Sequence, residues 1–379
     1  MAIKYLSGDR LQGTSAERAA ITLTDYTPTG DLVELGRATH SGNTNAYVEL
    51  TNISTTADHL QILGVVIGGG NCEMRMGGTS VETNAYFNRS HAVNSGTPSA
   101  NVNVNVHEFM SNTPSNSDNV RFFVWDIQNV AGREKMGVMR GMDNDNGDTN
   151  VPDAYIGNFS YAGQADLNEQ LRTFWYEDDN RNTSTPFKTG TEIVVIGQNY
   201  SGTEVTGSTT PPNTGFWELL GEHTASSTVN ELKVTEFAKK KYLKFQFQKH
   251  SSGDGGRHPL ARVYVNNSEV TGSDYHNRYS ENGASFTSNT TNTMYTNVDN
   301  SGAGTYLITG YICNIADKNK MVMTNVLDCG EIGGAREVQR REYYTNINQS
   351  SNQIDGLKFY DSGSANWLTG SSLKIWGHD

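Results

Sequence analysis

The sequence predicts an all-β protein made of two tandem β-sandwich or jelly-roll domains from an internal duplication, with a short N-terminal arm. Three observations lead to this prediction. The chain of 379 residues contains 39 Gly and only 35% hydrophobic residues, a composition typical of short strands joined by polar turns. Several of its short apolar runs alternate apolar and polar residues with the period of a strand. Finally, the same pattern occurs twice along the chain.

Four segments recur in the same order at a nearly constant spacing. Such self-similarity indicates a tandem duplication and is best settled before the fold is argued. Each copy supplies eight or so short strands with regular turns, which favours a sandwich or jelly roll in each half. The matches are NVAGREKM (129–136) with NIADKNKM (314–321), LVELG (32–36) with WELLG (217–221), Tyr86-x-Asn88-Arg89 with Tyr275-x-Asn277-Arg278, and GTEIVVIG (190–197) with GSSLKIWG (370–377).

The domain boundaries follow from these repeats. Residues 1–30 precede the first copy and form the predicted arm, in which TSAE at 14–17 fits a helix capping box. An arm of this kind serves as a docking segment or is simply a frayed chain end. The first sandwich is predicted at 31–197 and the second at 216–379. Between them, residues 198–215 are rich in Gly, Ser, Thr and Pro and form a natural linker.

The repeated NVAGREKM and NIADKNKM segments are predicted to be hairpins. We expect Asn129 and Asn314 to end one strand, the next residues to form the turn, and the Lys-Met pairs at 135–136 and 320–321 to begin the return strand. The motif is therefore interpreted as architectural rather than chemical. Its methionines are expected to fill core space.

Charge and hydropathy exclude two classes of partner. The formal net charge is −12, with 29 Lys and Arg against 41 Asp and Glu, and no long basic run is present, so a nucleic-acid surface is not expected. No segment resembles a secretory signal, and none approaches the roughly 18 apolar residues that a membrane helix needs. We expect a soluble product made in the cytoplasm, with no membrane partner.

Three cysteines, Cys72, Cys313 and Cys329, are an odd number in a long chain and do not indicate a disulfide framework. If the second hairpin turns near Asp317, the residue opposite Cys313 is near Val322, well short of Cys329. Free thiols packed as small apolar side chains are expected.

The segment MDNDNGDTNVPD, residues 142–153, offers the strongest candidate metal site. Asp143, Asp145 and Asp148, together with Asp153, could supply oxygen ligands to calcium. The spacing departs from the EF-hand pattern, because Gly147 stands at the fifth position and no glutamate stands at the twelfth. A solvated acidic turn is the alternative. No cofactor other than calcium is predicted.

Two further loops contain residue types used in catalysis or metal binding. YEDDN at 176–180 could contribute a carboxylate pair to a glycosidase, and His250, Asp254 and His258 could bind a metal. Solvated loops are the plainer interpretation of both. The chain has no Gly-x-Ser-x-Gly elbow and no Walker A loop, so an enzyme is not expected.

Aromatic residues provide one more candidate binding surface. The aromatics at 174–176 and 342–344, and those of the Tyr-x-Asn-Arg repeat, could stack on sugar rings with Asn and Arg as hydroxyl partners. Cross-strand packing is the alternative. Because Tyr-x-Asn-Arg recurs in both halves, a shared structural role is favoured for it.

Four segments carry a resemblance to a known group of proteins. They are KYLSGDRLQGTSAER near the start, WELLGEHT, NIADKNKM and the terminal GSSLKIWGHD. Together they resemble structural proteins of marine viruses and tailed phages, whose β-sandwich units open with Trp-Glu-Leu-Leu-Gly and end with Gly-x-x-Leu-x-x-Trp/Tyr-Gly. The resemblance spans nearly the whole chain through short motifs. The first half departs from it, with Leu32 in place of the opening Trp and Ile196 where the second half has Trp376.

This resemblance implies a non-enzymatic, homo-oligomeric virion structural protein on the particle surface, either tail-associated, a fibre protein or a capsid component. Such a protein is synthesised in the host cytoplasm and assembles with other virion proteins. Two alternatives stay open. One is a double jelly-roll major capsid protein, and the other is a lectin-like module that binds host surface glycans for attachment.

Overall fold

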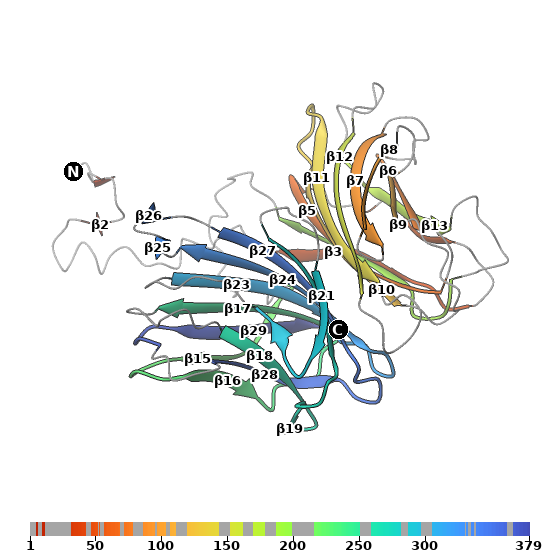
Figure 1. The fold of residues 1–379 in the computed structure, drawn as a ribbon. Coiled ribbons are helices and arrows are strands. Elements are labelled where there is room, and N and C mark those ends of the chain that lie inside the picture. Colours follow the sequence, from red (N-terminus) through yellow and green to blue (C-terminus); the bar gives the residue numbers. More distant parts are fainter. Residues whose placement is uncertain are drawn as a thin grey trace, which may run out of the picture.

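The computed structural model consists of two β-sandwiches (Figure 1). Every regular element among the described residues is a strand, which confirms the all-β prediction. None of these elements is a helix that could span a membrane. The structure describes residues 5–6, 10–11, 32–42, 47–51, 53, 57–68, 72–78, 86–94, 97–103, 107–110, 120–143, 152–161, 170–178, 187–198, 216–250, 259–281, 287–296, 305–329, 331–332, 335–336, 339–361 and 367–379.

The predicted N-terminal arm is described only as a short hairpin, β1 (Tyr5–Leu6) with β2 (Arg10–Leu11). The predicted capping box and the linker after Gln198 lie outside the described residues.

The first sandwich pairs a large sheet of eight strands with a small sheet of four. The large sheet has the order β3 (Val33–Thr39), β14 (Glu192–Gln198), β5 (His59–Ile67), β10 (Val120–Gln128), β11 (Lys135–Asp143), β12 (Asp153–Tyr161), β7 (Tyr86–Asn94), β8 (Thr97–Asn103). The small sheet has the order β4 (Tyr47–Leu50), β13 (Thr173–Asp178), β6 (Cys72–Gly77), β9 (His107–Met110).

The second sandwich is built in the same way. Its large sheet has the order β15 (Glu218–Thr224), β29 (Ser372–His378), β17 (Tyr242–His250), β23 (Thr305–Cys313), β24 (Lys320–Cys329), β27 (Gln339–Ile347), β20 (Tyr275–Glu281), β21 (Thr287–Thr291). Its small sheet has the order β16 (Glu231–Thr235), β28 (Ile354–Asp361), β18 (Pro259–Val265), β19 (Ser268–Glu269), with β22 (Met294–Tyr295) also on β18; β25 (Glu331–Ile332) and β26 (Ala335–Arg336) form a separate hairpin.

The strand order within each sandwich is that of a jelly roll. In the first half, the opening strand β3 pairs with the closing strand β14, β4 pairs with β13, β5 with β10, and β6 with β9. Eight strands that fold back on themselves and wrap into two sheets give this nested pairing. Strands β7, β8, β11 and β12 extend the large sheet beyond this core.

The two halves share irregular features as well as strand order. Leu35 is an extra residue between β3 and β14, and Leu220 is the extra residue at the corresponding place between β15 and β29. The glycine after each bulge allows close packing, because a Cβ would lie 2.8 Å from Ile53 at Gly36 and 2.5 Å from Val234 at Gly221. These shared bulges explain the repeated Leu-Gly pairs. The duplication itself stays an inference from the sequence.

The repeated hairpin motif anchors each large sheet to its small sheet. The side chains of Asn129 and Asn314 are fully buried, and their Oδ1 atoms accept hydrogen bonds from the backbone N–H of Leu171 and Ile354, both at 2.7 Å. Each amide nitrogen also donates to two backbone carbonyls, those of Ala57 and Leu171 in the first half and those of Lys240 and Ile354 in the second.

The lysine of the motif closes the same turn in both halves. Lys135 donates to the carbonyl of Val130 at 2.9 Å, and Lys320 donates to the carbonyl of Ile315 at 2.8 Å. Each lysine also binds a second turn carbonyl. The residue at the turn has positive φ in both halves, 72° at Gly132 and 60° at Asp317. The predicted hairpins are therefore present at the predicted positions.

One detail of the hairpin prediction needs correction. Met136 is 52% exposed, whereas Met321 is fully buried, so only the second methionine fills core space. The cross-strand partner of Cys313 is Met321, next to Val322 and well short of Cys329, as predicted. Cys313 is a buried free thiol, and Cys329 pairs in register with Thr305. The side chains of Cys72 and Cys329 lie outside the described residues.

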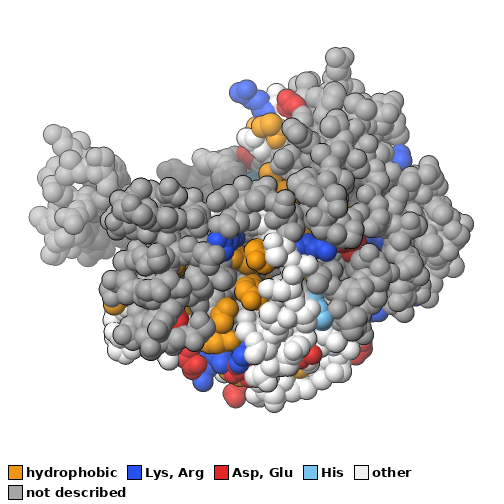
Figure 2. All heavy atoms as spheres, in the orientation of Figure 1, with side chains coloured by type: hydrophobic (Ala, Val, Ile, Leu, Met, Phe, Trp, Pro, Cys, Tyr) orange, Lys and Arg blue, Asp and Glu red, His pale blue; other side chains and the backbone are white. Residues whose placement is uncertain are grey.

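Three apolar cores hold the molecule together. One lies inside each sandwich, with Trp125 and Phe123 central to the first and Phe247 and Trp367 to the second. The third lies between the two large sheets and contains residues of both halves. On the face drawn in Figure 2, described apolar side chains emerge only as small groups among charged and polar ones.

Candidate functional site

The outer faces of the two large sheets pack against each other and form the inter-sandwich interface. In Figure 1 the strands β10, β11 and β12 of the first large sheet stand upright, whereas β17, β23 and β24 of the second run across the view. The apolar centre contains Leu63, Val65, Ile67, Val120, Phe122, Val124, Met142, Ala154, Val194 and Ile196 from the first half, and Phe216, Tyr242, Cys313, Met321, Met323 and Tyr344 from the second part of the chain.

The sequence of β5 explains why it lies at this interface. In HLQILGVVI every residue after His59 is buried, because Leu60, Ile62 and Val66 face the core of the first sandwich while Leu63 and Val65 face the second sandwich. The apolar run at residues 62–67 is typical of a strand covered on both faces. By contrast, YLKFQFQKH in β17 alternates buried and partly exposed residues along most of its length.

A buried carboxylate joins the two halves at one side of the apolar centre. Glu192, on β14, accepts a hydrogen bond from the hydroxyl of Tyr242 at 2.7 Å and lies 3.0 Å from the ammonium of Lys241. From its own half, Arg37 and Thr39 bind the same carboxylate at 3.2 and 2.8 Å. Burial alone would raise the pKa of Glu192, but these cationic and hydroxyl neighbours hold that pKa below its ordinary value.

The same side is extended by the end of the second half. The carboxylate of Glu34 lies 3.0 Å from Arg37 and 3.1 Å from the ring nitrogen Nε2 of His378. Arg37 also donates to the backbone carbonyl of Asp379. A chain of alternating charges therefore links β3 and β14 of the first sandwich to β17 and β29 of the second.

A second ionic cluster joins the halves at the loop end of the β11–β12 hairpin. Asp153 accepts from Arg278 of β20 at 2.6 Å, and both side chains are buried. Asp143, its cross-strand partner, accepts from the hydroxyl of Tyr155 at 3.0 Å and lies 3.8 Å from Arg121. Two buried arginines thus balance two buried aspartates, as burial of charge requires.

Polar contacts also cross the interface beside its apolar centre. Gln61 donates to the hydroxyl of Tyr311 at 3.0 Å and to Asp126 at 3.0 Å. Within the second half, beside Tyr311, the ammonium of Lys244 lies 5.9 Å from the ring of Trp217 and 6.0 Å from that of Tyr311. Burial lowers the pKa of Lys244, and burial raises the pKa of Tyr311 to about 12.

Chemically, this arrangement is suited to holding two domains in one orientation. Its charged groups are buried opposite partners of the other sign, and its centre is apolar. Breaking such an interface would expose apolar surface and separate buried ion pairs. The sequence patterns did not predict this interface.

The predicted calcium ligands are only partly described. Asp143 is buried and accepts a hydrogen bond from Tyr155. The guanidinium of Arg121 neutralises the negative charge of Asp143 that would attract calcium. Asp145 and Asp148 lie outside the described residues. Within the described part of the chain, no group of three or more His, Cys, Asp or Glu could hold a metal ion. Calcium binding by this loop therefore stays a prediction.

The two other candidate loops are also incompletely described. In YEDDN, Tyr176 is buried in the core of the first sandwich. The side chains of Glu177 and Asp178, and the whole of Asp179 and Asn180, lie outside the described residues. His250 ends β17, where its N–H donates to the hydroxyl of Ser371. Asp254 and His258 lie outside the described residues, so the metal prediction stays untested.

Most of the candidate stacking aromatics are interior residues. Phe174 and Tyr176 belong to the first core, Tyr275 and Tyr343 to the second, and Tyr344 to the interface. None of these five presents an exposed ring. Trp175 differs, because it is only partly buried and stacks on Tyr47.

The Tyr-x-Asn-Arg repeat has a structural role in the second half. The hydroxyl of Tyr275 donates to the carbonyl of Val270 and accepts from the N–H of Val263. Asn277 Oδ1 accepts from the N–H of Tyr295, which ties β20 to β22. Arg278 reaches Asp153 of the first sandwich. The side chains of the first copy, Tyr86, Asn88 and Arg89, lie outside the described residues.

Neither the protein-family models nor the curated proteins include a match to this sequence. The class of protein defined by fold and interface is therefore a two-sandwich all-β protein whose halves are joined through their large sheets.

Proposed function

We propose that the protein is a non-enzymatic structural subunit of a virion, exposed on the particle surface as a tail-associated, fibre or capsid component and assembled as a homo-oligomer. It would be made in the host cytoplasm and join other virion proteins there. The observation that carries the proposal is the inter-sandwich interface, in which the outer faces of both large sheets serve to join the halves.

This use of the large sheets favours a building role. Ligand sites require concave surfaces with convergent polar groups, whereas the buried charges of this interface are matched to one another. A subunit that must transmit load or hold a fixed shape benefits from such a joint. Because a fold alone does not define a function, the resemblance of the short motifs to virion proteins is the second support.

The double jelly-roll capsid alternative is favoured by a different observation. Both halves have the nested strand order of a jelly roll, an architecture that recurs in viral capsid and lectin domains. Fibre and capsid roles predict different symmetries for the assembled protein, so they can be separated by its shape.

The test is the mass and shape of the purified protein, measured by light scattering on a sizing column and by negative-stain imaging. The proposal expects a stable closed oligomer, filament or shell. A trimer with pseudo-sixfold outline would favour the capsid alternative, and an elongated assembly would favour a fibre. A monomer at all concentrations, with or without purified virion partners, would contradict the proposal.

A further inference from the structure

The outer face of the small sheet in the first sandwich carries an aromatic pair. Strand alternation turns Val48, Phe174 and Tyr176 into the core, so their neighbours Tyr47 and Trp175 point away from it. The two rings stack with centroids 6.3 Å apart and an interplanar angle of 29°, and Tyr47 is 38% exposed. This surface lies on the opposite side of the first sandwich from the inter-sandwich interface.

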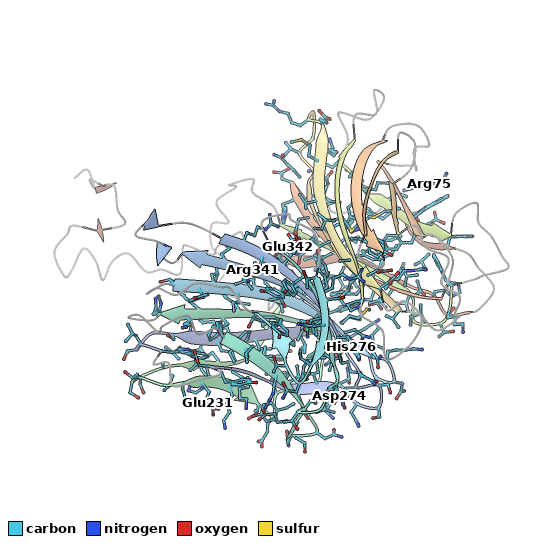
Figure 3. The ribbon with its side chains drawn as sticks, in the orientation of Figure 1. Arg75, Glu231, Asp274, His276, Arg341 and Glu342 are labelled. Atoms are coloured by element: carbon cyan, nitrogen blue, oxygen red, sulfur yellow. The ribbon has the colours of Figure 1, made fainter. Side chains whose placement is uncertain are left out.

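Planar polar side chains flank the pair. In the small sheet, Trp175 has Glu49 as its cross-strand partner on one side and Arg75 on the other. Figure 3 shows Arg75 on the side of the first sandwich that faces away from the second. A guanidinium donates, and a carboxylate accepts, several hydrogen bonds in fixed directions, which suits vicinal hydroxyl groups.

A pocket of about 410 Å³ opens beside the same face, between the edge strands β3 and β4. Thr39, His40, Ser41, Tyr47 and Glu49 contribute to its wall. Its volume is in the range of sites for small organic ligands, and its wall mixes hydroxyl, imidazole, carboxylate and aromatic groups.

His40 supplies an unmet hydrogen-bonding group at this pocket. Its Nδ1 accepts from the N–H of Gly42 at 3.0 Å, so in the neutral ring the proton is carried by Nε2. His40 is more than nine-tenths buried, and its Nε2 has no hydrogen-bond partner among the described residues. A buried donor without an acceptor is costly, and this one belongs to a residue of the pocket wall.

The second sandwich shows what the corresponding face looks like without such a pair. There Arg262 has Lys358, not tryptophan, as its cross-strand partner. Glu269 lies 2.8 Å from Arg262 and 2.6 Å from Lys358, so ion pairs cover that face. Where the first half has the Tyr47–Trp175 pair, the described part of the second half therefore has a cluster of charged side chains around Tyr360.

We propose that this face of the first sandwich binds a neutral saccharide, with a sugar ring stacked on Tyr47 and Trp175 and hydroxyl groups held by Arg75, Glu49 and the pocket beside them. Sugar rings present an apolar C–H face and a rim of hydroxyls, which matches an aromatic platform bordered by polar side chains. Neutral sugars are favoured over acidic ones because Glu49 borders the platform and the chain carries a net charge of −12.

The experiment uses the full chain on an array of immobilised neutral, uronic-acid and sialylated glycans, followed by calorimetric titration with the best neutral saccharide. We expect saturable binding of the wild type to neutral glycans. Trp175→Ala and Tyr47→Ala should each weaken it by roughly tenfold or more, whereas Trp175→Phe and Tyr47→Phe should retain most of it.

Tyr360→Ala is the matched control, because Tyr360 lies on the outer face of the small sheet in the second sandwich, and it should bind like the wild type. Melting temperatures of all variants identify any that fail to fold. Absence of neutral-glycan binding, binding only to acidic glycans, or unchanged binding by folded Trp175→Ala would overturn the proposal. Light scattering of the same variants reports separately on assembly, so the proposed virion role can stand or fall independently.

Discussion

Asn129 and Asn314 bind equivalent backbone groups in different halves of the molecule. Each amide accepts from the N–H of a residue at the start of a small-sheet strand, Leu171 or Ile354, and donates to the carbonyl of that same residue. Each also donates to a carbonyl just before a central strand of the large sheet. A single side chain therefore joins the two layers of each sandwich, which explains why the motif recurs.

Removal of the Asn314 side chain should destabilise the folded protein. Asn314→Ala leaves the Ile354 N–H and two carbonyls without their partner, and we expect a loss of about 2–3 kcal/mol in the free energy of unfolding, measured by urea titration. Asn292→Ala, at an exposed turn, serves as the control and should change it by less than about 0.5 kcal/mol. Equal effects of the two variants would show that the hydrogen bonds of Asn314 contribute nothing to the free energy of unfolding.

The two methionines of the motif offer a paired test of the interface. Met321 is buried between the large sheets, so Met321→Ala should destabilise the protein by about 2–5 kcal/mol. Met136 is 52% exposed, and Met136→Ala should stay within about 0.5 kcal/mol. Urea unfolding of both variants under one set of conditions compares the two losses in the free energy of unfolding. A small effect at Met321 would argue against a packed interface.

The Asp153–Arg278 pair can be tested by a double-variant cycle. Arg278→Met leaves the Asp153 carboxylate buried without its cation, and we expect a loss of about 3–5 kcal/mol. Adding Asp153→Asn removes the unbalanced charge and should recover part of that loss. If the two single losses simply add in the double variant, the side chains do not interact across the interface.

Glu192 should make the inter-sandwich interface sensitive to acid. Its folded-state pKa is lowered, so its contribution to stability is fully present above the pKa of the unfolded chain and is lost as the pH falls through the lower, folded value. The difference in melting temperature between the wild type and Glu192→Gln should therefore be constant near neutrality and shrink below about pH 4. A difference that does not depend on pH would contradict this assignment.

Cys313 should be chemically inert in the folded protein. Burial raises the pKa of its thiol to about 12, and the reactive thiolate is essentially absent at neutral pH. We expect no labelling of Cys313 by a soluble maleimide until the chain is unfolded, as followed by peptide mass spectrometry. Rapid labelling of this residue in the native protein would be inconsistent with its position in the interface.

The all-β class and the hairpins could be predicted because their signals are local. Alternation in strands such as β17 and the turn after Asn314 depend on neighbours in the chain. The packing of one large sheet on the other is not local, yet the sequence of β5 carries a sign of it, because its apolar run at residues 62–67 indicates burial on both faces.

The candidate site was harder to predict because charge partners come from distant parts of the sequence. Asp143 resembles a calcium ligand within its own segment, and only the fold shows that Arg121 and Tyr155 contact it. Glu192 begins an apolar strand and has no local feature that marks it, since its cross-interface partners Lys241 and Tyr242 belong to the second half. Exposure likewise distinguishes Trp175 from its interior neighbours only once the sheets are placed.

Joining the halves through their large sheets has a consequence for spacing. The molecule is four sheets thick at the crossing, with a small sheet on each outer side, and packed sheets lie about 10 Å apart. At the crossing, the two small sheets are therefore separated by three such spacings, or roughly 30 Å. Any two bodies that attach to them would be kept at that separation by a stiff spacer rather than by a flexible tether.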